Sequence, residues 1–130
     1  MKHIEVVAGA IEHDGKILCM LRDKGKYDYV SYKWEFPGGK IEEGETKEEA
    51  LKRELKEEME LDVEILGHLI DVNHTYPDFT MNMYCFACRA KSPKFVMNVH
   101  KDFKWLEIKD LKTLDWAEAD KPIVDKLIKG

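Results

Sequence analysis

One stretch of the chain, residues 34–61, constrains the fold and the chemistry more than any other. It reads WEFPGGKIEEGETKEEALKRELKEEMEL. Gly38 and Gly39 permit positive φ and let the backbone approach a ligand closely. Thr46, followed three residues later by Glu49, forms a capping box, which predicts that a helix starts there. The stretch therefore predicts a strand end, a glycine turn, a loop and a helix rich in carboxylates.

The predicted helix runs to about Met59 and carries three of its carboxylates on one sector. At about 100° per residue, Glu58 lies roughly 40° from Glu54 on one side and Glu57 roughly 60° on the other. The apolar residues of the helix fall within or beside the same sector. Like charges that are crowded and partly buried need a cation nearby. Hard oxygen ligands of this kind favour Mg²⁺ or Mn²⁺.

A solvated surface helix, held by ion pairs between residues four apart, is the alternative interpretation of KEEALKRELKEEMEL. Such a helix would place its carboxylates opposite its apolar residues. Here both share the half that faces the protein. Arg53, one turn before Glu57, can neutralise part of the acidic charge, and a divalent ion the rest. The glycine turn before the helix favours the metal-site interpretation.

The spacing of these residues resembles the Nudix box, GX5EX7REUXEEXGU, in which U is a bulky aliphatic residue. Gly39 is followed after five residues by Glu45, and the run from Arg53 to Leu61 follows after seven more. The final glycine of the box is replaced by Glu60, which is expected to strain the turn or slightly extend the helix. The flanking WEFPGGK and IEVVAGAIEHDGKILCMLR are similar to those of MutT-like enzymes, including cytidine triphosphate pyrophosphohydrolases.

The resemblance implies a fold and an activity. The fold is α+β, an α/β/α sandwich with a mixed β-sheet and a loop–helix–loop Nudix box, in a single domain over residues 1–130. The activity is Mg²⁺-dependent hydrolysis of a nucleoside triphosphate to the monophosphate and pyrophosphate, with Mn²⁺ as the other possible ion. The substrates implied are cytidine, 5-methylcytidine or oxidised purine nucleotides. A Nudix hydrolase of ADP-ribose, or a nucleotide-binding module without catalysis, are the alternatives.

Carried over position by position, the resemblance also implies site residues. The metal ligands are three side chains and one backbone carbonyl: Glu54, Glu57, Glu58 and the carbonyl of Gly38. Glu54 is in addition a candidate general base. Arg53 and Glu45 orient these carboxylates through charge-assisted hydrogen bonds. The residues expected to contact the nucleotide are Arg22, Glu35, Phe36, Lys40 and Asp120.

Two of these nucleotide contacts have a structural alternative. Arg22 ends a predicted strand and could be a solvated charge. Asp120 lies two positions before Pro122, which opens the last predicted helix. Ionised, its carboxylate would accept from an exocyclic amine of a base, and protonated it could also donate. Asp is equally suited to the N-cap of that helix.

A second departure from the resemblance lies six residues before Trp105. Related chains usually carry a glutamate there, often followed by histidine, whereas this chain has Val99 and His100. The missing carboxylate predicts slower turnover or a looser metal site, unless Asp102 replaces it. A Val99→Glu variant is then expected to gain rate or metal affinity.

The remaining sequence predicts further elements. A two-residue hairpin is expected at Asp14 and Gly15, and a polar, tyrosine-rich loop at 23–33 could stack on a base or pack on the surface. Cys85 and Cys88 form a CxxC motif whose thiols would face opposite sides of a strand. Strands are expected at 3–12, 16–22, 63–73, 79–90 and 103–107.

Charge and hydropathy limit the partners. The formal net charge is −5, which argues against a nucleic-acid polymer as partner but not against a nucleotide, because a metal can bridge phosphate to carboxylate. No apolar run approaches the ~20 residues that span a membrane. The sequence is therefore typical of a cytoplasmic monomer or homodimer that acts on a small molecule.

Overall fold

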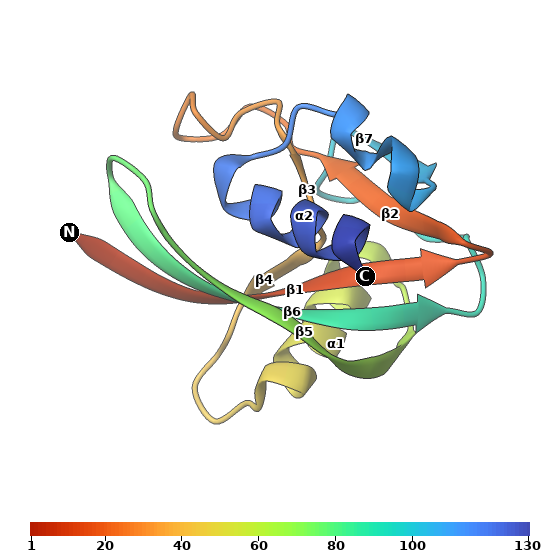
Figure 1. The fold of residues 1–130 in the computed structure, drawn as a ribbon. Helices are drawn as coiled ribbons and strands as arrows, with labels where there is room; N and C mark the ends of the chain where they lie inside the picture. Colours follow the sequence, from red (N-terminus) through yellow and green to blue (C-terminus); the bar gives the residue numbers. More distant parts are fainter.

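The computed structural model describes residues 1–130. The fold is built around one mixed β-sheet (Figure 1). The strands run in the order β3-β2-β1-β6-β5, while β4 pairs with β1 and β7 pairs with β2. The central pair β1 and β6 is parallel, and the other pairs are antiparallel. The strands are β1 Lys2–His13, β2 Lys16–Leu21, β3 Trp34–Glu35, β4 Gly38–Lys40, β5 Val63–Thr75, β6 Phe79–Ala90 and β7 Asp102–Leu106.

The two α-helices, α1 (Lys47–Met59) and α2 (Lys121–Lys129), cover opposite faces of this sheet (Figure 1). Alternate residues of β1 serve the two faces, as the period of a strand requires. Val6 and Ala8 belong to the core under α2, and Val7 belongs to the core under α1. This layering confirms the predicted α/β/α sandwich. Two short 3-10 helices, Ile108–Thr113 and Glu118–Asp120, lead into α2.

The predicted hairpin between β1 and β2 is confirmed. Asp14 has φ 50° and Gly15 has φ 79°. Positive φ at both central residues is the requirement of the tight turn that matches the twist of two antiparallel strands. The pairing of Glu12 with Ile17 and of His13 with Lys16 follows from it.

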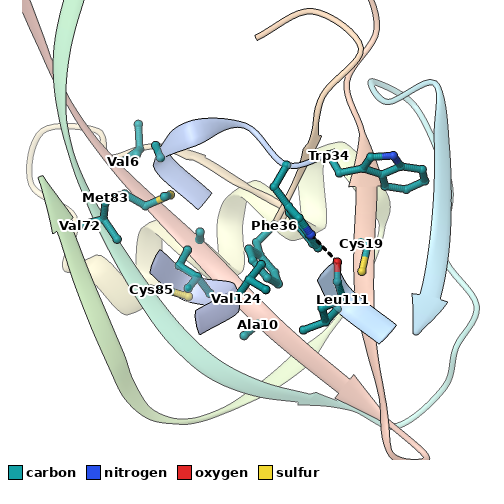
Figure 2. Packing of buried hydrophobic residues seen from close by; sticks show 14 of the residues in the cluster. Val6, Ala10, Cys19, Trp34, Phe36, Val72, Met83, Cys85, Leu111 and Val124 are labelled. Atoms are coloured by element: carbon teal, nitrogen blue, oxygen red, sulfur yellow. Dashed lines mark hydrogen bonds between the residues drawn. The ribbon is translucent and has the colours of Figure 1, made fainter. Parts of the chain in front are cut away.

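The core under α2 contains the aromatic residues that will shape the site. Figure 2 shows Phe36 and Trp34 in the same cluster as Leu111 and Val124. The ring of Phe36 stacks on that of Trp116 with centroids 4.6 Å apart. The indole N–H of Trp116 donates to the carbonyl of Leu111 at 2.7 Å. These contacts hold the chain just before the glycine pair in a fixed place.

Helix α1 begins as predicted and ends at Met59. The side chain of Thr46 accepts from the backbone N–H of Glu49, and the side chain of Glu49 accepts from the N–H of Thr46. The following residue, Glu60, is in the left-handed region at φ 50° and ψ 38°. The predicted strain at the missing glycine is therefore confirmed, because a side chain at positive φ carries a steric cost that glycine avoids.

The predicted glycine turn is wrong in its local geometry. Gly38 and Gly39 form strand β4 against β1, and neither is among the residues with positive φ. What requires glycine is space: a Cβ on Gly38 would lie 1.9 Å from the carbonyl oxygen of Val7. A Cβ on Gly39 would lie 2.4 Å from the carboxylate of Glu54. The close approach is to the protein's own backbone and side chain.

The cysteines pack in the interior. Cys85 lies in the core under α2 and Cys88 in the core under α1, so the two thiols face opposite sides of the sheet as predicted. All three cysteines are free and buried. Burial raises the pKa of the Cys88 thiol to about 12. A protonated, buried thiol is a packing group rather than a nucleophile.

Candidate active site

A cleft of about 930 Å³ opens beside β4. The structure brings most of the predicted site residues to it: Arg22, Glu35, Phe36, Gly38, Lys40, Glu54, Glu58 and Asp120. Its wall toward α1 carries Gly38, Gly39, Glu54 and Glu58, and is called the acidic side below. Its wall toward α2 carries Tyr27, Phe36, Tyr76, Phe79 and Asp120, and is called the aromatic side. Glu57, Arg53, Glu45 and Asp102 do not line the cleft.

Arg53 does not line the cleft, but its hydrogen bonds hold carboxylates at the acidic side in place. Its guanidinium donates two hydrogen bonds to the carboxylate of Glu45, from Nε at 2.6 Å and from Nη2 at 3.0 Å. Nη1 donates to Glu54 at 3.0 Å, and Nη2 donates to the carbonyl of Lys40 at 3.0 Å. Arg53 thereby connects the loop that carries Glu45, strand β4 and helix α1. A planar guanidinium with several N–H donors is suited to this role. The hydrogen bonds from Arg53 lower the pKa of Glu45.

Glu54 and Glu58 meet on the cleft wall. They lie one helical turn apart on α1, and both side chains line the cleft. Burial, together with the neighbouring Glu54 carboxylate, raises the pKa of Glu58 to about 7. Two acids in this position share a site that disfavours two negative charges. A cation placed between them would remove that penalty.

Glu57 takes a different place. Its side chain is 62% exposed and accepts from Arg53 Nη1 at 3.2 Å. No set of three or more His, Cys, Asp or Glu side chains gathers at the spacing of a metal centre. The structure therefore brings together two of the three predicted carboxylate ligands. Glu54 and Glu58 are hard oxygen donors beside strand β4, so they fit a divalent cation such as Mg²⁺. Glu57 would join them only if its hydrogen bond with Arg53 were broken.

Asp120 belongs to the aromatic side and corrects a structural expectation. It stands at the start of α2, yet its side chain makes no cap hydrogen bond. Instead Oδ1 accepts from the backbone N–H of Phe36 at 2.9 Å. Burial, and then the charge of Glu35, raise the pKa of Asp120 well above its ordinary value. Asp120 therefore occupies the predicted N-cap position, but its side chain does not cap the helix and its carboxyl group lies on the cleft wall instead.

Two hydrogen-bond donors hold Glu35 between the sides. Arg22 Nη1 donates to Oε1 at 3.2 Å, which places this predicted nucleotide contact at the cleft rather than in bulk solvent. His100 Nε2 lies 2.8 Å from Oε2. Val99, at the position of the missing carboxylate, lines the cleft and is 57% exposed. Asp102, the suggested replacement, is exposed at the start of β7 and its side chain accepts from the N–H of Phe103.

The tyrosine-rich loop contacts the turn between β5 and β6 across the mouth of the cleft. Tyr27 stacks on Tyr29 with centroids 5.3 Å apart, and Tyr29 stacks on Tyr76 at 5.1 Å. Tyr27 also packs against Phe79 at 5.5 Å. The hydroxyl of Tyr29 donates to Asp78 at 2.9 Å. Two roles were expected for this loop, stacking on a base or packing on the surface. The structure shows packing, and Tyr27 packs where it lines the cleft.

Comparison with known families decides what kind of protein this is. A family model described as the NUDIX domain matches residues 1–127. This chain belongs to the NUDIX family of hydrolases. The predicted α+β Nudix fold is thereby confirmed, and so is the assignment of the chain as an enzyme of this family. No helix is long and apolar enough to cross a membrane.

Relatives within the NUDIX family match nearly the whole chain. The chain is 26% identical to the 8-oxo-dGTP diphosphatase of Escherichia coli K12, over 98% of both chains. It is 30% identical to the CTP pyrophosphohydrolase of the same organism, over 96% of this chain and 91% of the relative.

Solved structures of the NUDIX family show the same architecture. A MutT protein from methicillin-resistant Staphylococcus aureus 252 is 35% identical, with a TM-score of 0.77 over 99% of this chain and 98% of that one. The MutT NUDIX hydrolase of Burkholderia pseudomallei superposes with a TM-score of 0.84 at 23% identity, over 97% and 98%. The second likeness concerns the fold alone.

Sequence reasoning missed several residues of this NUDIX cleft. Tyr76 accepts from the backbone N–H of Ala119 at 2.9 Å and so joins the β5–β6 turn to the segment before α2. His100 and Phe79 also line the cleft without having been predicted. His100 was recognised in the sequence as the residue after Val99, but it was given no role in the site. The sequence carries no comparable signal for Tyr76 or Phe79, which belong to an ordinary strand–turn pattern.

Proposed function

We propose that this NUDIX protein hydrolyses nucleoside triphosphates to the monophosphate and pyrophosphate with Mg²⁺ as cofactor and Mn²⁺ as the other usable ion. The observation that carries the proposal is the pairing of Glu54 and Glu58 on the cleft wall beside Gly39. Two partly buried carboxyl groups on the same wall of a cleft are unfavourable by themselves and favourable around a cation. Such an ion supplies charge neutralisation for phosphate oxygens and a lowered pKa for water.

The protein's own residues then have defined roles. Glu54 and Glu58, with Glu57 after a rotation away from Arg53 and with the Gly38 carbonyl, would hold the cation. Glu54 accepts a hydrogen bond from Arg53 at 3.0 Å, and we assign it the role of accepting a proton from the attacking water. Lys40 and Arg22 are among the cationic side chains that line the cleft, and they are the ones proposed to contact phosphate groups.

The aromatic side is proposed to hold the base. Phe36 lines the cleft, and Asp120 has one carboxyl oxygen occupied by the Phe36 N–H, which leaves the other for a base. A protonated Asp120 could donate to a ring nitrogen or carbonyl and also accept from an amine. The relatives are named for 8-oxo-dGTP and CTP. We therefore propose cytidine, 5-methylcytidine or oxidised purine nucleotides as substrates, and a changed preference in an Asp120→Asn variant.

A nucleotide-binding module without catalysis is the second candidate. Two observations favour it: Glu57 faces away from the cleft, and Val99 stands where a carboxylate would be expected. A binding module would hold a triphosphate and a metal ion without turnover. Binding without product formation therefore separates the two candidates.

The test is a product analysis over a panel of triphosphates. The purified protein is incubated with canonical, 5-methylated and 8-oxo nucleotides, with Mg²⁺ or with EDTA, and the products are resolved by ³¹P NMR. The proposal expects monophosphate and pyrophosphate only when Mg²⁺ is present. Release of orthophosphate, cleavage of ADP-ribose in preference to triphosphates, or binding with no product would overturn it.

A further inference from the structure

His100 lies in the loop between β6 and β7, yet it is one of the least accessible side chains of the cleft. Its side chain is 5% exposed. The next residue anchors the loop, because the N–H of Lys101 donates to the carbonyl of Leu21 at 2.9 Å. A second anchor lies earlier in the loop, where the N–H of Val96 donates to the carbonyl of Met59 at 2.8 Å. A loop fixed at both points delivers the imidazole to one place.

That place is the carboxylate of Glu35. His100 Nε2 is 2.8 Å from one oxygen, and Arg22 Nη1 is 3.2 Å from the other. Glu35 accepts both hydrogen bonds as a carboxylate, so Nε2 carries the proton of the imidazole. Because the side chain of Glu35 is only 22% exposed, water replaces a lost donor poorly. Its orientation therefore depends on the two donors.

Glu35 also lies next to the residue that contacts the aromatic side. The following residue, Phe36, donates its N–H to Asp120 Oδ1 at 2.9 Å. A shift of the Glu35 carboxylate would consequently disturb its contact with Arg22 and the adjoining backbone that meets Asp120.

We propose that His100 is a positioning residue that acts through Glu35: it fixes the Glu35 carboxylate, and with it Arg22, in the arrangement that receives the nucleotide. The proposal rests on the proposed function in so far as the cleft takes a nucleotide. The β6–β7 loop of this chain then contributes to the site through the imidazole of His100, which holds the side chain of Glu35. The alternative is that His100 only packs the loop, and this alternative predicts a loss of stability without any dependence on Glu35.

The test combines three variants with a matched control. His100→Ala is expected to raise KM about 10-fold and to change kcat by less than about threefold, since a hydrogen bond to a charged group is removed without touching Glu54 or Glu58. His100→Gln, whose amide can donate to Glu35, should recover to within about threefold of wild type. In a Glu35→Ala background, where the acceptor is gone, His100→Ala should add less than about twofold.

The control is His68→Gln. His68 forms a similar pair, 2.7 Å from Asp71, but on an exposed face away from the cleft. This variant should keep the wild-type KM. Equal KM values for His100→Ala and wild type, multiplicative effects of the His100 and Glu35 changes, or an effect of His68→Gln as large as that of His100→Ala would each overturn the proposal.

A second measurement does not need turnover. Long-range ¹H–¹⁵N NMR of the imidazoles should show Nε2 of His100 protonated, with a ¹⁵N shift that changes in Glu35→Gln while that of His68 stays constant. An unprotonated Nε2, or a shift that ignores Glu35→Gln, would contradict the assignment. A wild-type protein that releases no pyrophosphate would refute the proposed function instead, and nucleotide binding by calorimetry would then replace KM in the comparison of His100 variants.

Discussion

The acidic side of the cleft is held by charge, and the aromatic side by ring contacts and one buried carboxyl group. On the acidic side a single guanidinium, that of Arg53, bonds to three carboxylates and a carbonyl from three different segments. On the aromatic side, Tyr27, Tyr29 and Tyr76 stack in sequence between a loop and a turn. Charge-assisted hydrogen bonds are directional and geometrically specific, whereas stacked rings tolerate displacement.

This difference suggests a division of labour. Chemistry at phosphorus needs exact placement of a metal and water, so a rigid ionic frame suits the acidic side. Discrimination among bases needs shape and a few polar groups, which the aromatic side supplies. Substitutions on the two sides should therefore differ in size and in the kinetic constant that they change.

The largest effect is expected at the glycine pair. Gly38→Ala places a Cβ 1.9 Å from a backbone oxygen of β1, which only a separation of the strands can relieve. We expect a loss of about 4 kcal/mol or more in the free energy of unfolding, measured by urea denaturation. Gly39→Ala meets only the movable end of Glu54 at 2.4 Å. It should stay folded and lose about 100-fold in kcat/KM. Equal loss of stability in both variants would contradict this distinction.

Arg53→Ala should come next, and should lower kcat more than it raises KM. Residues that orient metal ligands typically contribute roughly 10- to 100-fold to activity or metal affinity, and Arg53 orients Glu54 directly. The measurement is steady-state kinetics at several Mg²⁺ concentrations. Arg89→Ala is the matched control, because Arg89 is exposed and reaches only Glu12 at 4.0 Å. An unchanged kcat in Arg53→Ala would refute the claim that Arg53 holds the carboxylates at the acidic side in their working positions.

On the aromatic side, Asp120→Asn tests the buried acid through the pH dependence of stability. The pKa of Asp120 is raised in the folded protein, so the folded state holds this proton more tightly than the unfolded chain, whose Asp has a pKa of about 3.9. This contribution to stability is complete below pH ~4 and is lost as pH rises through the raised pKa. Asn does not ionise and can still accept from Phe36.

The free energy of unfolding of Asp120→Asn, relative to wild type, should therefore increase as the pH is raised from 4 to 8. Urea denaturation across that range measures it. A difference between the two proteins that stays constant with pH would show that Asp120 is ionised in the folded state, with its usual pKa.

The smallest effect is expected at the contact across the cleft mouth. Tyr29→Phe removes the hydroxyl that donates to Asp78 and keeps the stacked ring. The KM for a triphosphate should change about twofold to threefold, with kcat unaltered. Tyr32→Phe serves as the control, since Tyr32 is 51% exposed. A fall in kcat for Tyr29→Phe as large as that of Arg53→Ala would remove the contrast between the two sides.

What the sequence could predict is local. The capping box at Thr46, the end of α1 near Met59 and the hairpin at Asp14 and Gly15 depend on residues a few positions apart, and all are confirmed. The Nudix box spans 39–61, so its spacing also identified the fold and the pairing of acids on one helix face.

What it could not predict joins distant segments. Phe36 meets Asp120 across 84 positions, Glu35 meets His100 across 65, and Tyr29 meets Asp78 across 49. None of these pairs has a periodic or spacing signal. The glycine pair was recognised from the sequence, but the reason that Gly38 must be glycine was not. That reason is the close approach of Gly38 to Val7, which depends on the pairing of two strands.

The central claim is that Glu54 and Glu58 hold a divalent cation against the phosphates of a nucleotide. The most direct measurement is the rate of pyrophosphate release by wild type, Glu58→Gln and the exposed helix control Glu48→Gln, each as a function of Mg²⁺ concentration. The account predicts release that saturates with Mg²⁺ and stops in EDTA. It also predicts an unchanged Glu48→Gln, and a loss of at least about 100-fold in Glu58→Gln. Release that is independent of Mg²⁺, or a Glu58→Gln variant as active as Glu48→Gln, would contradict it.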